Sequence, residues 1–295
     1  MPQPDIGSLG VCYRRVPVLA IGRDIYLDSR LQIAKLELLY SDIPPLGAND
    51  PSGRAVQAIL SRYINDGGVF AAAVHLLPST TPGLLNVDVL RDRFHLLGFD
   101  IRESIVRNRP NALIQLEATF DFIESTLLSN DRKWILETET PGLADLEAIW
   151  PIAWIIGIRG ALPSEKFSPA IFPNVYSWVA RFNKAVAEAR NRIGEPEEIS
   201  GSEAAALIRK STFFEGEDVI KQDLRVSEEV IHKGDMMTIG PSDYGRTHRE
   251  NGPLLSMNSL EVVIEAVEQN PPLRIHAPRH GFVVQRKEAQ ELAKL

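Results

Sequence analysis

The sequence has almost no cysteine, no long apolar run and no excess of basic residues. Cys12 is the single cysteine among 295 residues, so no disulfide can form within the chain, which suits the reducing cytoplasm. The longest apolar run, Ile149–Ile158, is about half the length that a helix needs to span a bilayer. Acidic residues outnumber basic ones, 39 to 32. We therefore expect a cytoplasmic protein that binds neither nucleic acid nor membrane.

The signatures of several other protein classes are missing. The six histidines are scattered and no CxxC pairs accompany them, so no metal site is predicted. The sequence has neither a GxSxG motif nor a Walker loop, and its N-terminus lacks the features of a signal peptide. Hydrophobic residues make up 44% and charged residues 24% of the chain. This composition indicates a globular protein of two or three domains.

The first forty residues have the pattern of a strand, a turn, a second strand and a helix. Val16–Ile21 is apolar throughout, which is typical of a strand covered on both faces. Asp24–Leu27 continues as an extended segment, and Asp28 and Ser29 stand where a helix should begin. Residues 41–53 are rich in Pro, Gly and Asp, which predicts a linker.

From residue 54 to about 192 the apolar residues recur at helical spacing, which predicts a bundle of packed helices. A largely apolar helix is predicted from Leu143 to about Arg159, with a kink or break at Pro151 because proline removes one backbone hydrogen bond. A last helix is predicted over Asn174–Ile193.

A second linker, Gly194–Gly201, precedes a segment of different character. A short helix is predicted over Ser202–Lys210 with Ser202 as its N-cap. Short strands favour a small β-barrel or sandwich, with a tight hairpin at Asn258-Ser259. The predicted strands are Asp235–Ile239, Pro253–Met257, Leu260–Val267, Leu273–His276 and Phe282–Gln285.

Pro17 and the pair Asp28-Ser29 are the strongest candidates for a binding site. Proline inside a paired strand is tolerated if the preceding bond is cis, which turns the backbone groups of Val16 outward. At the start of a helix, Asp28 and Ser29 would present a carboxylate, a hydroxyl and free N–H groups, which suit a zwitterionic amino acid. The plainer alternatives are an edge strand with trans-proline, a helix cap, and a surface pair between Asp28 and Arg30.

The segment YRRVPVLAIGRDIYLDSRLQIAKLE resembles the second half of the thioredoxin-like domain of cytosolic glutathione transferases. The resemblance implies that Val16 and Pro17 form the cis-proline pair of this family. It also implies that Asp28 and Ser29 hold the γ-glutamyl end of glutathione, the cofactor or co-substrate. Four cofactor-binding residues are therefore expected: Val16, Pro17, Asp28 and Ser29.

The resemblance extends over about residues 9–192. Thr140–Asp145 is similar to the capping box that starts a helix in the all-helical second domain of the family, with Gly142 in place of the usual Ser or Thr. The C-terminal stretch is similar, more loosely, to an extra β-rich domain of a fungal subset. We therefore expect an α+β fold in three parts. These are a partial thioredoxin-like α/β unit (1–45), an all-helical glutathione-transferase C-terminal-like domain (54–193) and a β-rich, barrel-like accessory domain (202–295).

The sequence departs from the family at its N-terminus. The family opens with a strand, a helix and another strand, and carries there the Tyr, Ser or Cys that activates the glutathione thiol. Cys12 and Tyr13 lie outside that motif, so no catalytic residue is assigned. The family's sheet order would leave Val16–Ile21 with an open apolar edge. We expect either that the natural protein is longer or that this edge pairs with another segment.

Two functions follow from the resemblance. The first is a glutathione transferase that joins glutathione to an apolar electrophile, or uses it to assist an elimination or isomerisation, in detoxification or specialised metabolism. A homodimer is usual in such proteins. The second is a non-catalytic, glutathione-transferase-like binding or scaffold protein that lacks the thiol-activating segment.

Three further groups have both a functional and a structural interpretation. Trp150, Trp154 and Trp178 could line an apolar pocket or belong to the bundle core. His276–His280 could bind an anion or act as a base, or simply form a turn between two strands. A third group, His95, Arg91 and Arg102, could face the cleft between domains or lie on exposed helix surfaces.

Overall fold

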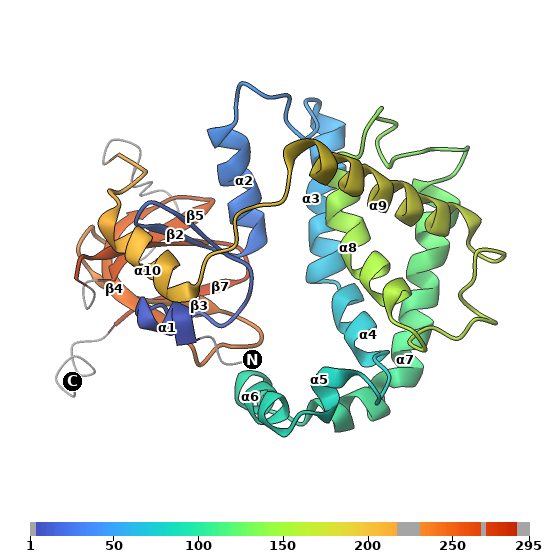
Figure 1. Ribbon diagram of the computed structural model, residues 1–295, viewed down its shortest axis with the longest axis horizontal. Helices are drawn as coiled ribbons and strands as arrows, with labels where there is room; N and C mark the ends of the chain where they lie inside the picture. Colours follow the sequence, from blue (N-terminus) through green and yellow to red (C-terminus); the bar gives the residue numbers. More distant parts are fainter. Residues whose placement is uncertain (1–3, 217–230, 267–269, 288–295) are drawn as a thin grey trace. The chain divides into compact units, whose positions relative to one another are not determined.

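The computed structural model describes residues 4–216, 231–266 and 270–287, and the chain divides into two compact units. The first unit consists of Met1–Ser41, His95–Gly98 and Glu198–Leu295, and the second of Asp42–Phe94 and Phe99–Glu197. Both ends of the chain, blue and orange to red in Figure 1, thus build the first unit. The light-blue, cyan, green and yellow helices build the second.

The first unit contains one seven-stranded sheet in the order β1-β2-β6-β5-β4-β3-β7. The strands are β1 (Val18–Ile21), β2 (Asp24–Leu27), β3 (Met236–Pro241), β4 (Glu250–Met257), β5 (Glu261–Ala266), β6 (Leu273–Pro278) and β7 (Phe282–Arg286). Its helices are α1 (Pro4–Ser8), α2 (Ser29–Leu39) and α10 (Gly201–Lys210). The strands match those predicted to within a few residues, except that Val267, the predicted end of β5, lies outside the described residues.

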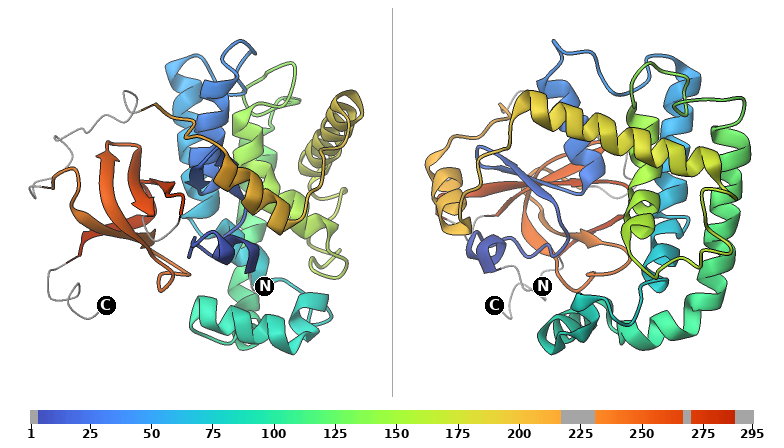
Figure 2. Two further views of the ribbon diagram at one scale, coloured as in Figure 1. Left: turned by 60° about the vertical axis from the view of Figure 1, so that its left-hand side comes forward. Right: turned by 45° about the vertical axis from the view of Figure 1, so that its right-hand side comes forward.

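The pairing of β2 with β6 joins the two ends of the chain. β2 pairs with β1 in antiparallel fashion and with β6 in parallel, with Tyr26 opposite His276. Figure 2 (right) shows the blue hairpin β1–β2 beside the orange and red strands. Ile25 and Leu27 of the hairpin share one core with Ile264 and Ile275 of the C-terminal strands. The α+β class is confirmed. The segments 1–45 and 202–295, expected as separate parts, contribute to one sheet, because β2 finds its second neighbour in β6.

The covered strand is β2 rather than β1. Every residue of β2 is buried, whereas the residues of β1 are half-buried or exposed. The prediction that Val16–Ile21 is covered on both faces is wrong, because Val16, Pro17 and Ala20 are exposed and the other residues are only half-buried. Within the described residues, the outer edge of β1 has no strand beside it.

The turn between β1 and β2 requires glycine. Gly22 has a φ of +61°, and a Cβ atom there would lie 2.3 Å from the carbonyl oxygen of Thr212. The same oxygen accepts a hydrogen bond from the backbone N–H of Arg23 at 3.1 Å. The chain after α10 thus runs directly over this turn, and no larger residue fits between them.

The second unit is the predicted helical bundle. Its elements are α3 (Pro51–Asn65), α4 (Val69–His75), α5 (Pro82–Leu85), α6 (Val87–Leu97, whose end belongs to the first unit), α7 (Ile101–Phe122), the π-helix η1 (Ile123–Leu127), α8 (Leu143–Gly157) and α9 (Pro173–Ile193). Leu116 and Phe120 of α7, Ile149 of α8 and Trp178 of α9 lie in its buried core. Within the described ranges, no helix combines the length and apolarity needed to cross a membrane.

Two helix predictions can be sharpened. Of the kink or break predicted at Pro151, a break does not occur, because α8 continues through this residue. Pro151 and Ile152 are buried there, and this burial offsets the lost backbone hydrogen bond. The N-cap of α10 is Ser200 and not Ser202. The Ser200 hydroxyl accepts from the Glu203 N–H at 3.2 Å, and the Glu203 carboxylate accepts from the Ser200 N–H at 2.8 Å. Only Ser200 has a glutamate three residues on, as a capping box requires.

Candidate functional site

Asp28 and Ser29, which we call the α2 corner, connect the end of β2 to the start of α2. Asp28 is the N-cap of the helix, and its carboxylate accepts a hydrogen bond from the Arg30 N–H at 3.0 Å. The predicted helix start is confirmed. Asp28 has a φ of +67°, which few residues other than glycine adopt and which is frequent at ligand sites. Ser29 is exposed, so its hydroxyl can reach a ligand.

Pro17 lies next to the first turn of α2. The Val16–Pro17 peptide bond is cis, as predicted. The side-chain amide of Gln32 donates hydrogen bonds to the carbonyl oxygens of Pro17 at 2.9 Å and Tyr26 at 3.0 Å. Val16 is 70% exposed. The fold thus brings the predicted Val16-Pro17 pair and the α2 corner to the same end of the hairpin.

The Asp28 carboxylate is already paired within the protein. Arg30 contacts it with Nε at 3.1 Å and with a terminal nitrogen at 3.3 Å, and the two side chains are only 22% and 12% exposed. The plainer interpretation of Asp28 as a partner of Arg30 therefore holds. A ligand ammonium group would have to share this carboxylate with the guanidinium.

Tyr13 lies close to the corner but is enclosed. It is 2% exposed, and its ring stacks on that of Phe282 at 5.9 Å. Burial raises the pKa of its phenol, and the negative charge of Asp28 raises it further. The Tyr13 hydroxyl is therefore neutral at physiological pH, and the closed environment keeps substrates away from it.

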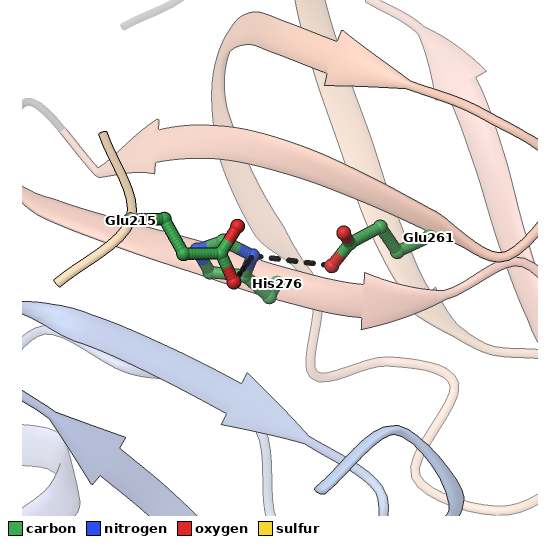
Figure 3. Close-up of side chains that lie close together, drawn as sticks. All are labelled: Glu215, Glu261 and His276. Atoms are coloured by element: carbon green, nitrogen blue, oxygen red, sulfur yellow. Dashed lines mark hydrogen bonds and ion pairs between the residues drawn. The ribbon is translucent and has the colours of Figure 1, made fainter. Parts of the chain in front are cut away.

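A buried group of ionisable side chains lies behind the corner, and we call it the charged cluster. At its centre is His276 of β6, which is fully buried. Its Nε2 lies 2.9 Å from Asp24 of β2, and its Nδ1 lies 3.2 Å from Glu261 of β5. Figure 3 shows Glu215 and Glu261 directed toward the imidazole ring. The members of the cluster are Asp24, Tyr26, Lys35, Glu215, Glu261 and His276.

Lys35 of α2 closes the cluster. Its Nζ lies 2.5 Å from Glu215 and 2.9 Å from Glu261. The carboxylate and imidazole atoms of Glu215, Glu261 and His276 lie within 4.8 Å of one another, a spacing that also suits a metal ion. In this protein, however, the ammonium group of Lys35 already pairs with both glutamates.

The protonation states in the cluster support one another. Burial lowers the pKa of His276, but its hydrogen bonds to Asp24 and Glu261 outweigh this effect and raise the pKa overall. Burial raises the pKa of Glu261, but hydrogen bonds from His276 and Lys35 outweigh it and lower the pKa overall. The pKa of Lys35 is raised, because its two carboxylate partners outweigh the effect of burial. The cluster therefore holds charged groups that burial alone would neutralise.

Of this cluster the sequence indicated only His276, at the end of the predicted strand Leu273–His276 and at the start of the group His276–His280. Strand β6 extends to Pro278, so the turn interpretation is wrong for His276. Asp24, Lys35 and Glu261 were missed altogether. The available signal was an ionisable residue inside an otherwise apolar strand, as Asp24 is in DIYL and His276 in LRIHAP.

The other candidate groups divide between core and surface. Trp178 is fully buried, so its core interpretation is correct, whereas Trp150 and Trp154 are 39% and 38% exposed. Both rings face Phe70, at 4.7 and 5.9 Å, and form an aromatic group on the helical unit. Arg91, His95 and Arg102 are exposed, as the alternative of exposed helix surfaces predicts, and the two arginines pair with Asp88 and Asp100.

Comparisons with known proteins establish the fold. Residues 72–191, less than half of the chain, match the model of a family described as a domain of unknown function (DUF7962). No curated protein matches the chain. The crystal structure of a GST-like protein from Pseudomonas syringae is similar, with 22% sequence identity and a TM-score of 0.65. The match covers 97% of this chain and 87% of that one. The chain therefore has the fold of a GST-like protein.

Proposed function

We propose that this protein binds glutathione at the α2 corner and transfers it to an apolar electrophile. The observation that carries the proposal is the position of Gln32, which ties the Pro17 carbonyl to the first turn of α2. This contact brings Val16, Pro17, Asp28 and Ser29 to one end of the hairpin. The GST-like fold of the similar protein supports the same ligand class.

The corner offers groups that complement the γ-glutamyl end of glutathione. The Ser29 hydroxyl and the N–H groups at the start of α2 would bind the ligand carboxylate, which the helix dipole also favours. Asp28 would receive the ammonium group beside Arg30. The backbone of Val16, a residue that is 70% exposed, would bind the peptide part of the ligand.

The transfer step would join the glutathione sulfur to an electrophilic carbon, while a leaving group departs or a proton adds. It requires the thiol to lose its proton, and we assign no residue to that task. An elimination or isomerisation assisted by glutathione would use the same thiolate. The proposal extends to a homodimer in the cytoplasm of a fungus, with a role in detoxification or specialised metabolism.

The second candidate is a non-catalytic, glutathione-transferase-like binding or scaffold protein. The enclosure of Tyr13 favours this second candidate. The charge of Asp28 acts on the Tyr13 phenol, but the residue is only 2% exposed, so the phenol cannot contact a ligand bound at the corner. Such a protein would bind glutathione or a related ligand at the α2 corner without turnover.

Retention on immobilised glutathione tests the site. We expect the wild-type chain to be retained and Ser29→Ala and Asp28→Asn to lose at least about tenfold in affinity. Ser52→Ala is the matched control, because Ser52 lies exposed in the first turn of α3, in the other unit. A wild-type chain that is not retained, or a Ser29→Ala variant that binds normally, would contradict the proposal. Turnover of a generic aromatic electrophile then separates the enzyme from the scaffold.

A further inference from the structure

The charged cluster cannot act on a substrate directly. His276 and Asp24 are fully buried, and Glu215 and Tyr26 are buried beside them. Two of its members nevertheless belong to β2 and one to α2, the elements that meet at the α2 corner. The cluster is therefore placed to hold the corner in position.

Contacts of Asp24 and Tyr26 hold β2 in place. Asp24, its first residue, contacts His276 through Oδ1 at 2.9 Å and accepts hydrogen bonds from the backbone N–H groups of Phe214 at 2.6 Å and Glu215 at 3.2 Å through Oδ2. Two residues on, the Tyr26 hydroxyl donates to Glu215 at 2.9 Å. The strand cannot shift along its axis without breaking these contacts.

Contacts of Lys35 and Gln32 hold α2 in place. Lys35 lies six positions after Ser29 and binds Glu215 and Glu261, so the helix is held against the chain after α10 and against β5. Gln32, one turn earlier, binds the Tyr26 carbonyl of β2. The two elements that flank the corner thus share one buried carboxylate, that of Glu215, which binds Tyr26 of β2 and Lys35 of α2.

The geometry around His276 requires a protonated ring. Both ring nitrogens lie within hydrogen-bonding distance of a carboxylate oxygen, 2.9 Å to Asp24 and 3.2 Å to Glu261. Neutral imidazole has a single N–H, so one carboxylate would face a lone pair. Only the imidazolium form donates to both.

The charges that face His276 come from every element packed around it. Within the described residues, three carboxylates face Lys35, Arg274 and the ring itself, so they meet three cations if the ring is charged and two if it is neutral. Arg274 is counted because it donates to the Glu215 carbonyl at 2.7 Å. The facing groups are Asp24 and Tyr26 (β2), Lys35 (α2), Glu215 (after α10), Glu261 (β5) and Arg274 (β6).

We propose that Asp24, Lys35 and His276 are positioning residues for the α2 corner, and that ligand binding there requires His276 to carry its proton. This inference rests on the proposed function for the identity of the ligand. Loss of the proton leaves one carboxylate without its donor inside the protein. The resulting repulsion loosens β2 and α2, and the corner loses the fixed geometry that a ligand carboxylate needs.

The first test needs neither a ligand nor a stable variant. Nitrogen NMR of histidine-labelled wild-type protein reports the protonation of His276, whose signal is assigned by its absence in His276→Gln. We expect both ring nitrogens to be protonated at about pH 7.5, above the ordinary histidine pKa. A neutral ring at that pH would overturn the proposal.

The second test follows the corner itself. Hydrogen exchange of the Arg30 and Gln32 amides, which donate to Asp28, is corrected for its intrinsic pH dependence and should speed up in the wild type as His276 titrates. Exchange of these amides should be fast at all pH values in Lys35→Met. In Lys35→Arg their protection from exchange should be partly restored. Lys166→Met removes a surface pair with Glu117 in the other unit and should exchange like the wild type. Protection that stays constant through the titration would contradict the positioning role.

The third test uses S-hexylglutathione as the probe. Its affinity for the wild type should fall by up to about tenfold per pH unit above the His276 pKa, and Asp24→Asn and His276→Gln should lose this profile. A His276→Gln variant with the wild-type profile would overturn the inference. Should the probe fail to bind at any pH while corner protection still follows His276, the proposed function fails and the positioning role stands.

Discussion

Glu250 of β4 shows how one buried carboxyl group can make the stability of the fold depend on pH. It is buried, and its Oε1 accepts hydrogen bonds from the backbone N–H groups of Cys12 and Tyr13, both at 2.7 Å. Burial raises the pKa of Glu250 to about 7, in spite of these two hydrogen bonds. The folded protein thus holds this proton more tightly than the unfolded chain, for which the ordinary pKa is 4.5.

This difference predicts a loss of stability as the pH rises. The contribution of Glu250 is fully present below about pH 4.5 and is lost as the pH rises to about 7, with a magnitude of about 3 kcal/mol. Glu250→Gln keeps an acceptor for the two N–H groups and should lack this decline. Denaturant unfolding of both proteins across this pH range measures the difference. Parallel stability profiles would refute the assignment.

At the residue scale, the sequence predicted what depends on local chemistry. The cis bond before Pro17 and the helix start at Asp28 follow from neighbouring residues, and both are confirmed. The charged cluster could not be predicted, because His276 lies 252 residues after Asp24. The local sequence around either residue does not indicate that the other will contact it. Whether the α2 corner binds glutathione stays a prediction.

At the scale of elements, two helices begin with an acidic residue at the same position but in different surroundings. Asp145 of α8 is fully buried and accepts hydrogen bonds from the N–H groups of Ile135 at 3.1 Å, Gly142 at 3.0 Å and the Trp178 ring at 2.8 Å. Glu203 of α10 serves only its own helix end, at Ser200, in an exposed position. The first carboxylate joins three segments of the bundle, and the second caps one helix.

The two caps should therefore differ in their effect on stability. Asp145→Ala leaves three N–H groups without an acceptor and should lower the free energy of unfolding by about 3–5 kcal/mol. Glu203→Ala exposes its donor to water and should cost about 1 kcal/mol or less. Chemical denaturation of the two variants compares them directly. Equal losses would show that the buried hydrogen bonds of Asp145 contribute nothing beyond capping.

Periodicity predicted most elements but not their surroundings. The helical spacing of α7 and the short C-terminal strands are found as predicted. The covered strand was misassigned, since an apolar run such as VPVLAI shows only that side chains can be buried. Which strand receives two neighbours depends on pairing with β6, which the run itself does not encode.

At the scale of the whole molecule, the two units differ in how the chain builds them. The second unit uses the middle of the sequence, with only His95–Gly98 assigned elsewhere. The first unit needs both ends, because β2 pairs with β6 and α10 follows the last helix of the bundle. The division expected from linker composition could not reveal this, since composition marks where segments end and not which segments pair.

This arrangement predicts the behaviour of fragments. A fragment of residues 42–197 should be helical and unfold cooperatively, because its core is its own. Fragments 1–41 and 198–295 should each lack stable tertiary structure and should gain it when mixed, because they share one core. Circular dichroism and near-ultraviolet spectra follow both outcomes. A stable sheet in fragment 198–295 alone would contradict the prediction.

The parallel pairing of β2 with β6 also has a consequence for synthesis. At roughly 5–20 residues per second, a ribosome needs on the order of tens of seconds to add the 252 residues between Asp24 and His276. The helical bundle can fold during that time, while the apolar segment DIYL waits with its hydrogen-bonding edge unoccupied. A cell that makes this protein must therefore shield β2 until β6 has been synthesised, which makes the nascent chain a natural client of chaperones that act at the ribosome exit.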